Sequence, residues 1–152
     1  MEKYWILVDI DGTLSDASKR AEMYLNGDTP NWDGFYAACG TDAPIETIIN
    51  IVSHLCDFYD VVLCTGRRKS CEDATRAWLD VNAPRLAKVP ILFRNDGDKR
   101  HDTTVKPELL DKYIHDAHKH SYPMAIFEDR NSMVAKWREL GYTVLQTADG
   151  NF

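Results

Sequence analysis

The sequence predicts an α/β fold in which a parallel sheet carries helices on both of its faces. The first observation is that short apolar runs alternate with amphipathic stretches along most of the chain. The second is that these runs are continuously apolar, which is typical of strands covered on both faces. The third is the length of 152 residues, enough to bury the core of one domain. We therefore expect right-handed crossovers and a functional site at the carboxyl ends of the strands.

Five apolar runs mark the expected strands. They lie at residues 4–9, 60–64, 89–93, 124–127 and 143–145. Pro90 and Pro123 fall at the starts of their runs, where a missing backbone donor does the least harm. Both prolines are therefore compatible with strands.

Apolar residues with helical spacing predict one helix in each interval between these strands. The four stretches lie at residues 45–55, 74–78, 107–114 and 133–140. Pro44 is expected to open the first helix, and Ala74 and Ala77 are expected on the apolar face of the second. Pro107 is expected to be the first residue of the third helix, where its missing N–H is not needed. Gly141 is expected to end the fourth as the residue beyond the C-cap.

One segment, residues 15–43, interrupts this alternation. It is polar and aromatic, contains Gly, Pro and Asn, and lacks a clean strand pattern. A connection of this length inside a compact domain is usually functional. We expect a small cap insert over the functional site, with one short helix at residues 18–25. The whole chain, residues 1–152, is expected to form a single domain.

Composition excludes several classes of protein. The content of 44% hydrophobic and 28% charged residues is ordinary for a soluble globular chain. The first apolar run is too short for a signal peptide or a membrane span, so we expect a cytoplasmic protein. Four cysteines without a C-x-x-C pair indicate reduced and mostly buried thiols. A net charge of −6 argues against a long basic groove for duplex nucleic acid.

The strongest chemical signal follows the first strand, where the chain reads Asp9-Ile10-Asp11-Gly12-Thr13. Two carboxylates beside a glycine turn suit phosphoryl transfer, because one attacks phosphorus while the other passes a proton to the leaving oxygen. Mg²⁺ is the expected cofactor, since an anionic nucleophile must approach an anionic phosphate. The alternative is an ordinary turn after a strand, which leaves the later motifs unexplained.

This D-x-D-G-T motif resembles the first motif of phosphatases of the haloacid dehalogenase (HAD) superfamily. The resemblance implies the HAD fold, a Rossmann-like parallel sheet with a small cap insert after the first strand. It implies that Asp9 forms an aspartyl-phosphate and that Asp11 acts as general acid and then as base. It also implies that Asp9 and the backbone carbonyl of Asp11 bind Mg²⁺, with Gly12 and Thr13 beside the substrate.

Three further motifs match the superfamily in the same order. Thr65-Gly66-Arg67 follows the strand at 60–64, where a hydroxyl and backbone amides suit a phosphoryl oxygen. Lys106 opens the third helix, and the resemblance implies that it neutralises the attacked phosphate. Glu128-Asp129 follows the fourth strand, where the superfamily places an acidic pair that binds Mg²⁺. That pair is most often two aspartates, so which residue touches the metal stays open, with Asp129 favoured.

A longer stretch is similar to the 3′-phosphatase domain of phage-type polynucleotide kinase-phosphatases. Residues 97–106 resemble its G-D-x-R-x-D-x-x-V-K pattern, and residues 128–141 resemble its D-D-R…V…W-R…G pattern. The similarity implies removal of a 3′-phosphate from a nucleic-acid end, with a 2′,3′-cyclic phosphate as a second candidate. It implies substrate-binding roles for four residues: Arg20, Arg67, Asp102 and Arg130.

The charge and aromatic content of the loops agree with such a substrate. Basic residues that follow the predicted strands are expected to gather at one rim, unless they are scattered solvated charges. Aromatic residues of the insert either stack on a nucleobase or form the insert's own core, and these residues are Tyr24, Trp32, Phe35 and Tyr36.

Several alternatives stay open. The chain contains no G-x-x-x-x-G-K-[ST] run, so the similarity covers a phosphatase half without a kinase module. A separate kinase or ligase is therefore a candidate partner, and a phage-encoded protein would act in the cytoplasm of its host cell. A mononucleotide 5′- or 3′-phosphatase is the first rival, although the small insert favours an open site for a polymer end. A catalytically silent phosphate-binding module is the second, although it would not need both Asp9 and Asp11.

Overall fold

The computed structural model describes residues 4–152, so residues 1–3 of the expected domain lie outside the described part of the chain. A five-stranded sheet forms the centre of the molecule, with the strand order β5-β4-β1-β6-β7. Its strands are β1 (Trp5–Val8), β4 (Asp60–Arg68), β5 (Ile91–Arg94), β6 (Ala125–Arg130) and β7 (Val144–Gly150). Every neighbouring pair in this sheet is parallel, which confirms the predicted α/β fold.

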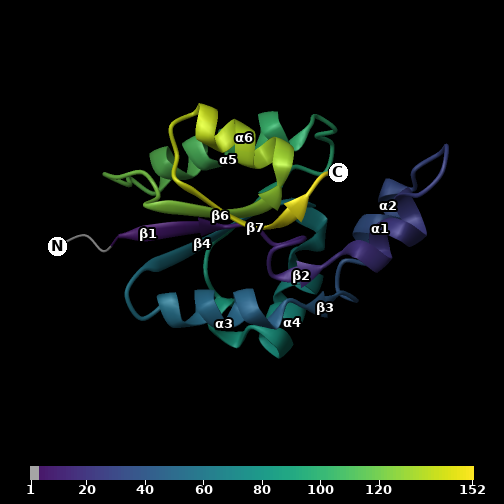
Figure 1. Ribbon diagram of the computed structural model, residues 1–152, viewed down its shortest axis with the longest axis horizontal. Coiled ribbons are helices and arrows are strands. Elements are labelled where there is room, and N and C mark those ends of the chain that lie inside the picture. The colour runs from purple at the N-terminus through teal and green to yellow at the C-terminus, as the bar shows by residue number, and fades with distance from the viewer. Residues whose placement is uncertain (1–3) are drawn as a thin grey trace.

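Helices cover both faces of the sheet (Figure 1), with α3 (Glu46–Leu55) and α4 (Glu72–Asn82) on one face, and α5 (Asp102–Asp116) and α6 (Asn131–Glu139) on the other. Alternate residues of β1 contribute to two separate cores. Ile6 and Val8 pack in the core that contains buried residues of α3 and α4. Trp5 and Leu7 pack in the core that contains buried residues of α5 and α6. All four residues are buried, which explains why this run shows no polar alternation.

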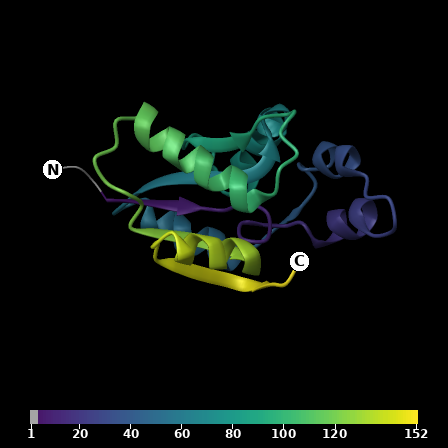
Figure 2. The same cartoon turned by 90° about the horizontal axis from the view of Figure 1, so that it is seen from above.

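The segment between β1 and α3 forms the predicted insert, which stands beyond the carboxyl end of β1 (Figures 1 and 2). A two-stranded antiparallel ribbon of β2 (Ser15–Asp16) and β3 (Ala43–Pro44) closes its base. α1 (Ser18–Leu25) confirms the helix predicted at residues 18–25. α2 (Trp32–Ala37) was not predicted, because it is short, contains a glycine and has no long apolar spacing.

The third predicted helix begins earlier than expected. The prediction that Pro107 is its first residue is wrong, because α5 begins at Asp102 and holds Pro107 in its interior. The His101 side chain accepts a hydrogen bond from the Thr103 amide at 3.2 Å, which caps the true N-terminus. The proline in the second turn removes one backbone donor without ending the helix. Lys106 therefore lies inside α5 and does not open it.

α4 is present as predicted, but its buried face differs from the expected one. Ala74 and Ala77 are exposed, whereas Thr75, Trp78 and Leu79 are buried. Small alanine side chains carry little information about which side of a helix is covered. Two short 3₁₀ helices flank this region: η1 (Lys69–Cys71) and η2 (Pro84–Leu86).

The central strands continue past their predicted ends. Thr65-Gly66-Arg67 lies within β4, and Glu128-Asp129 lies within β6. The strand pairing shifts register in both places, between Cys64 and Arg68 and between Glu128 and Arg130. Polar residues at such irregular strand ends do not form an apolar run. The apolar pattern therefore predicted strands shorter than those in the structure.

Two other expectations, on Gly141 and on the cysteines, are confirmed by local structure. Gly141 follows the C-cap of α6 with a φ of 93°, a left-handed conformation that favours glycine. All four cysteines are free, and three of them are buried. Within residues 4–152, no helix has both the length and the apolar character needed to cross a membrane.

Candidate active site

The loop after β1 separates the two acidic residues of the first motif. The amides of Thr13 and Leu14 both donate to the Ile10 carbonyl, at 3.1 and 2.8 Å, and so form a tight turn. Gly12 adopts a φ of 86° inside this turn. The Asp9 and Asp11 side chains consequently enter two different sets of contacts.

Asp9 belongs to a buried acidic cluster at the carboxyl ends of β1 and β6. Carboxylate oxygens of Asp9, Glu128 and Asp129 lie within 4.8 Å of one another. The Lys106 Nζ atom lies 2.7 Å from Asp9 Oδ1 and 2.9 Å from Glu128 Oε2. The Thr13 hydroxyl lies 3.3 Å from Asp9 Oδ2 and 3.2 Å from Asp129 Oδ1. Five residues from three of the four predicted motifs thus meet at one point.

The charges of this cluster do not balance. Burial raises the pKa of Asp9 well above its ordinary value, and the nearby Glu128 charge raises it further against the opposing Lys106 charge. Burial also raises the pKa of Asp129. The Asp9 and Glu128 charges raise the pKa of Lys106 even though burial acts in the opposite direction. One ammonium therefore faces three crowded carboxylates.

Gly12 is required by the close approach of Asp129. A Cβ atom added at residue 12 would overlap the Asp129 carboxylate. The positive φ of 86° at this position is a second reason for glycine. The glycine of the D-x-D-G-T motif therefore lets the first loop lie directly against the acidic pair of β6.

Asp11 lies in a second, basic environment formed with the insert. Its Oδ1 atom accepts hydrogen bonds from Arg20 Nη2 at 2.6 Å and from Arg67 Nη2 at 2.7 Å. Burial raises the pKa of Asp11, but the charges and hydrogen bonds of Arg67 and Arg20 outweigh burial and hold that pKa well below its ordinary value. The Asp11 side chain does not join the acidic cluster.

Asp42 completes this second group and was missed by the sequence reasoning. Its carboxylate accepts from Arg20 Nε at 2.9 Å and from Arg20 Nη2 at 2.7 Å, and Arg67 Nη2 lies at 3.3 Å. All three side chains are almost completely buried. The resemblance implied that Arg20 and Arg67 bind phosphate, whereas the structure pairs both with carboxylates.

The second motif lines the neighbouring strand end. Thr65 is completely buried, and its hydroxyl accepts a hydrogen bond from the Arg67 amide at 3.1 Å. The Gly66 carbonyl accepts from Arg94 Nε at 3.0 Å and from the Tyr36 hydroxyl at 3.3 Å. A Cβ atom at residue 66 would lie 2.7 Å from an oxygen of Asp102. Glycine here permits the first residue of α5 to approach β4.

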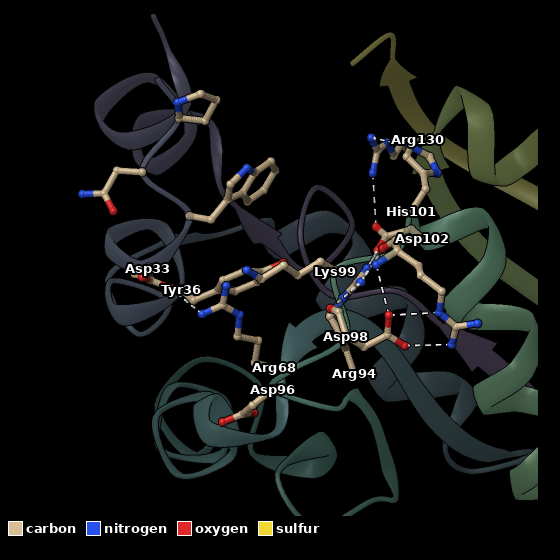
Figure 3. Close-up of a pocket in the computed structure, with 14 residues that line it drawn as sticks. Asp33, Tyr36, Arg68, Arg94, Asp96, Asp98, Lys99, His101, Asp102 and Arg130 are labelled. Atoms are coloured by element: carbon tan, nitrogen blue, oxygen red, sulfur yellow. Dashed lines mark hydrogen bonds and ion pairs between the residues drawn. The ribbon is translucent and has the colours of Figure 1, made fainter. Parts of the chain in front are cut away.

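Asp102, near the strand ends, lines an adjoining cavity of about 660 Å³. Arg94 and Arg130 both form ion pairs with the Asp102 carboxylate, the latter at 3.2 Å. Figure 3 shows these residues on the side of the main domain and Asp33 and Tyr36 of the insert opposite them. Several of the basic residues expected at one rim line this cavity: Arg68, Arg94, Lys99, Arg100, His101 and Arg130.

Comparisons with known proteins agree on one family. A family model described as the polynucleotide kinase PNKP phosphatase domain matches residues 3–152. A protein of Autographa californica nuclear polyhedrosis virus, provisionally named a bifunctional polynucleotide kinase/RNA ligase, is 25% identical over 137 residues, covering 89% of this chain and 18% of that protein.

Solved structures agree with this match. A chain in the structure of the Pnkp1/Rnl/Hen1 complex has a TM-score of 0.71 and 26% identity, over 98% of this chain and 47% of that chain. A haloacid dehalogenase-like hydrolase from Streptococcus pneumoniae shares the fold, with a TM-score of 0.69 and 15% identity over 95% of this chain and 84% of that one.

The chain therefore spans less than half the length of the viral relative and of the Pnkp1/Rnl/Hen1 chain. The residues that the family model matches nevertheless include every motif of the site described above. This chain belongs to the polynucleotide kinase PNKP phosphatase domain family and is a phosphatase of the HAD type.

Proposed function

We propose that this phosphatase is Mg²⁺-dependent and removes a 3′-phosphate from the end of a nucleic acid, with a 2′,3′-cyclic phosphate as a second candidate. The observation that carries the proposal is the Asp9 carboxylate, held 2.7 Å from the Lys106 ammonium and within a buried acidic cluster. This cluster lies beside a cavity lined by five Arg or Lys residues and four aspartates, and the small excess of basic residues suits an anionic polymer end. The family match supports the same class of substrate.

The residues of the cluster fit a magnesium ion. Carboxylate oxygens are the ligands that this hard cation prefers, and three of them converge here with only one ammonium among them. Both oxygens of Glu128 are engaged, one by Lys106 and one by the Asp129 amide at 3.2 Å. These contacts favour Asp9, Asp129 and the Asp11 carbonyl as ligands, with Glu128 holding Lys106. Bound Mg²⁺ would offset the negative charge of both the carboxylates and the phosphate.

Asp9 acts in this proposal as the nucleophile. Its carboxylate attacks phosphorus, the bond to the sugar O3′ breaks, and an aspartyl-phosphate forms. Lys106 and Thr65 stabilise charge on the phosphoryl oxygens. Water then attacks the aspartyl-phosphate, releasing inorganic phosphate and restoring Asp9.

Asp11 is ionised while it is paired with Arg20 and Arg67, so it takes up a proton from solvent after leaving them, passes that proton to the departing O3′ and later takes one from the attacking water. This role requires that Asp11 leave its ion pairs with Arg20 and Arg67. A bound phosphate would compete for the same two guanidinium groups, because their donors suit phosphate as well as carboxylate. The substrate itself would thus release Asp11 for proton transfer and would give both arginines the phosphate-binding role.

The cellular setting forms part of the proposal. The relatives are named for a kinase/ligase and for a Pnkp1/Rnl/Hen1 complex, and this chain covers only a part of each. From the names of these relatives, a kinase or ligase is proposed as a partner, with action in the cytoplasm. The four free thiols are compatible with that reducing compartment.

A substrate panel tests the function. The wild-type protein is expected to release phosphate from a 3′-phosphorylated oligonucleotide faster than from 5′-phosphorylated oligonucleotide, dTMP or 3′-dTMP, and EDTA is expected to stop the reaction. Preference for a mononucleotide would instead favour the nucleotidase rival, and undiminished activity in EDTA would refute the metal requirement.

Asp9→Asn tests the nucleophile. This variant is expected to keep the fold by circular dichroism and to lose Mg²⁺-dependent phosphate release, because an amide cannot form the aspartyl-phosphate. Asp111→Asn is the matched control, since Asp111 is an exposed carboxylate on α5. Full activity in Asp9→Asn would show that another residue attacks phosphorus.

A further inference from the structure

The cavity beside the acidic cluster has two chemically different sides. The insert contributes a largely aromatic and uncharged side that includes Pro30, Asn31, Trp32 and Tyr36, with Asp33 as its one charged residue, paired with Arg68. The main domain contributes a charged side in which basic residues, several of them the arginines described above, outnumber the three aspartates. Nucleotides present the same two chemistries, an aromatic base and an anionic backbone, and sites for unpaired nucleic acid combine them in this way.

Trp32 is the aromatic residue of the insert that stays open to solvent. It is 49% exposed, although its ring packs edge-on against Phe35 at 5.7 Å and lies tilted against Tyr36 at 6.1 Å. Its neighbours therefore hold the ring in place without covering it. A fixed and uncovered ring is a ready surface for stacking, because little side-chain freedom remains to be lost.

The other aromatic residues of α2 are already engaged. Phe35 is only 9% exposed and lies under the Arg20 guanidinium, 4.1 Å from its ring centroid. The Tyr36 ring carries the Arg68 guanidinium at 4.6 Å, and its hydroxyl bonds to the Gly66 carbonyl. The sequence left two interpretations open for these aromatic residues. Phe35 therefore belongs to the core of the insert, whereas Trp32 is suited to stacking on a nucleobase.

The inner end of this cavity borders the residues proposed to bind the phosphate. Asp102 lines the cavity and lies one helical turn before Lys106 on α5. Arg130 lines it as well and directly follows Asp129 at the end of β6. A phosphate placed against Asp9 and Lys106 would consequently have its nucleoside in the cavity.

We propose that Trp32 stacks on the base of the nucleotide that carries the scissile 3′-phosphate, and that the cavity accepts this nucleotide from a single-stranded end. The inference rests on the proposed function and deepens it. A volume of about 660 Å³ suits a small ligand and not a duplex end. Every base has a flat aromatic face, so Trp32 favours the presence of a base without selecting among the four.

A two-by-two comparison tests the role of Trp32. The first substrate is a single-stranded 3′-phosphorylated oligonucleotide, and the second is the same molecule with an abasic terminal nucleotide. We expect the ratio of their kcat/KM values to be about tenfold in the wild type, about one in Trp32→Ala, and mostly retained in Trp32→Phe. A loss of folded protein cancels in this ratio, because it lowers both values equally.

Phe58→Ala serves as the matched control, since Phe58 is 70% exposed and does not line the cavity. This variant is expected to keep the wild-type ratio. A wild-type ratio near one, or an unchanged ratio in Trp32→Ala, would overturn the inference while leaving the 3′-phosphatase function intact. A wild type that hydrolyses p-nitrophenyl phosphate but neither oligonucleotide would overturn the proposed function, and the inference with it.

Discussion

At residue 12 the backbone of the first loop turns through a φ of 86° and passes against the Asp129 carboxylate. In Gly12→Ala the new methyl group must push that carboxylate away from Asp9. A displacement of this kind in a reacting cluster costs about 100-fold in rate. We therefore expect kcat for a 3′-phosphorylated oligonucleotide to fall by about that factor, measured at saturating Mg²⁺.

Gly141→Ala separates this displacement from backbone strain. Gly141 has a similar φ of 93°, but a Cβ atom there would meet nothing within 4 Å. The strain of the left-handed conformation is expected to lower the free energy of unfolding by about 1–2 kcal/mol and to leave kcat unchanged. Equal losses of kcat in both glycine variants would show that strain, and not contact with Asp129, limits activity.

The two acidic residues of β6 make different contacts, so substitutions at them should have different effects on Mg²⁺ affinity. Asp129→Asn removes a proposed ligand, whereas Glu128→Gln weakens the support of Lys106. Loss of a supporting residue typically reduces metal affinity about 10- to 100-fold. We expect the affinity for Mg²⁺, measured by isothermal titration, to fall by more than this range in Asp129→Asn. In Glu128→Gln we expect the loss of affinity to stay within the range. The reverse order would identify Glu128 as the direct ligand.

The sequence predicted the members of the acidic cluster because each follows or lies near a strand end. Asp9 and Glu128-Asp129 stand at the ends of two apolar runs, and parallel strands bring such ends to one edge. Asp42 carried no such signal. It lies in the polar insert, and its two arginine partners are 22 and 25 residues away in sequence. Contacts of this kind depend on tertiary packing and leave no periodic pattern.

At the scale of elements, buried ion pairs attach the insert to the sheet. Arg20 of α1 and Arg67 of β4 share the Asp42 carboxylate, and all three side chains are almost completely buried. In Asp42→Asn, the two buried guanidinium groups lose one of the negative charges with which they pair. Removing one partner of a buried ion pair costs about 3–5 kcal/mol. We expect a loss of that size in the free energy of unfolding by urea, together with faster hydrogen exchange in α1 and α2.

Asp33→Asn is the comparison for this element-scale prediction. Asp33 also joins the insert to β4, through Arg68 at 2.6 Å, but its side chain is 87% exposed. Exposed ion pairs contribute less than about 1 kcal/mol. A larger loss in Asp33→Asn than in Asp42→Asn would show that the exposed contact holds the insert.

Helix and strand boundaries were the least predictable part of the fold. Pro107 suggested a helix start, but the cap at His101 lies earlier and tolerates a proline in the second turn. α2 escaped prediction because its start depends on the Asn31 side chain, which accepts a hydrogen bond from the Gly34 amide at 2.9 Å. A capping contact of one side chain cannot be recognised from apolar spacing. The existence and order of the long elements, by contrast, followed directly from that spacing.

At the scale of the whole molecule, the acidic cluster joins two halves of the sheet. Asp9 directly follows β1, and the neighbouring β6 carries Glu128 and Asp129. The alternation of strands and helices already indicated that these residues share an edge. The excess negative charge at that edge opposes folding in the absence of a metal, because three carboxylates are buried close together.

This repulsion leads to the last prediction, which concerns stability. A cation that binds the folded chain alone raises its free energy of unfolding by about 2.7 kcal/mol at a concentration of 100 Kd. We expect Mg²⁺ to raise the wild-type value by about that amount in urea titrations and to leave Asp129→Asn nearly unchanged. Sodium chloride at equal ionic strength is the control, since the net charge of −6 makes general screening stabilising as well. An equal effect of both salts on both proteins would mean that no specific ion joins β1 to β6.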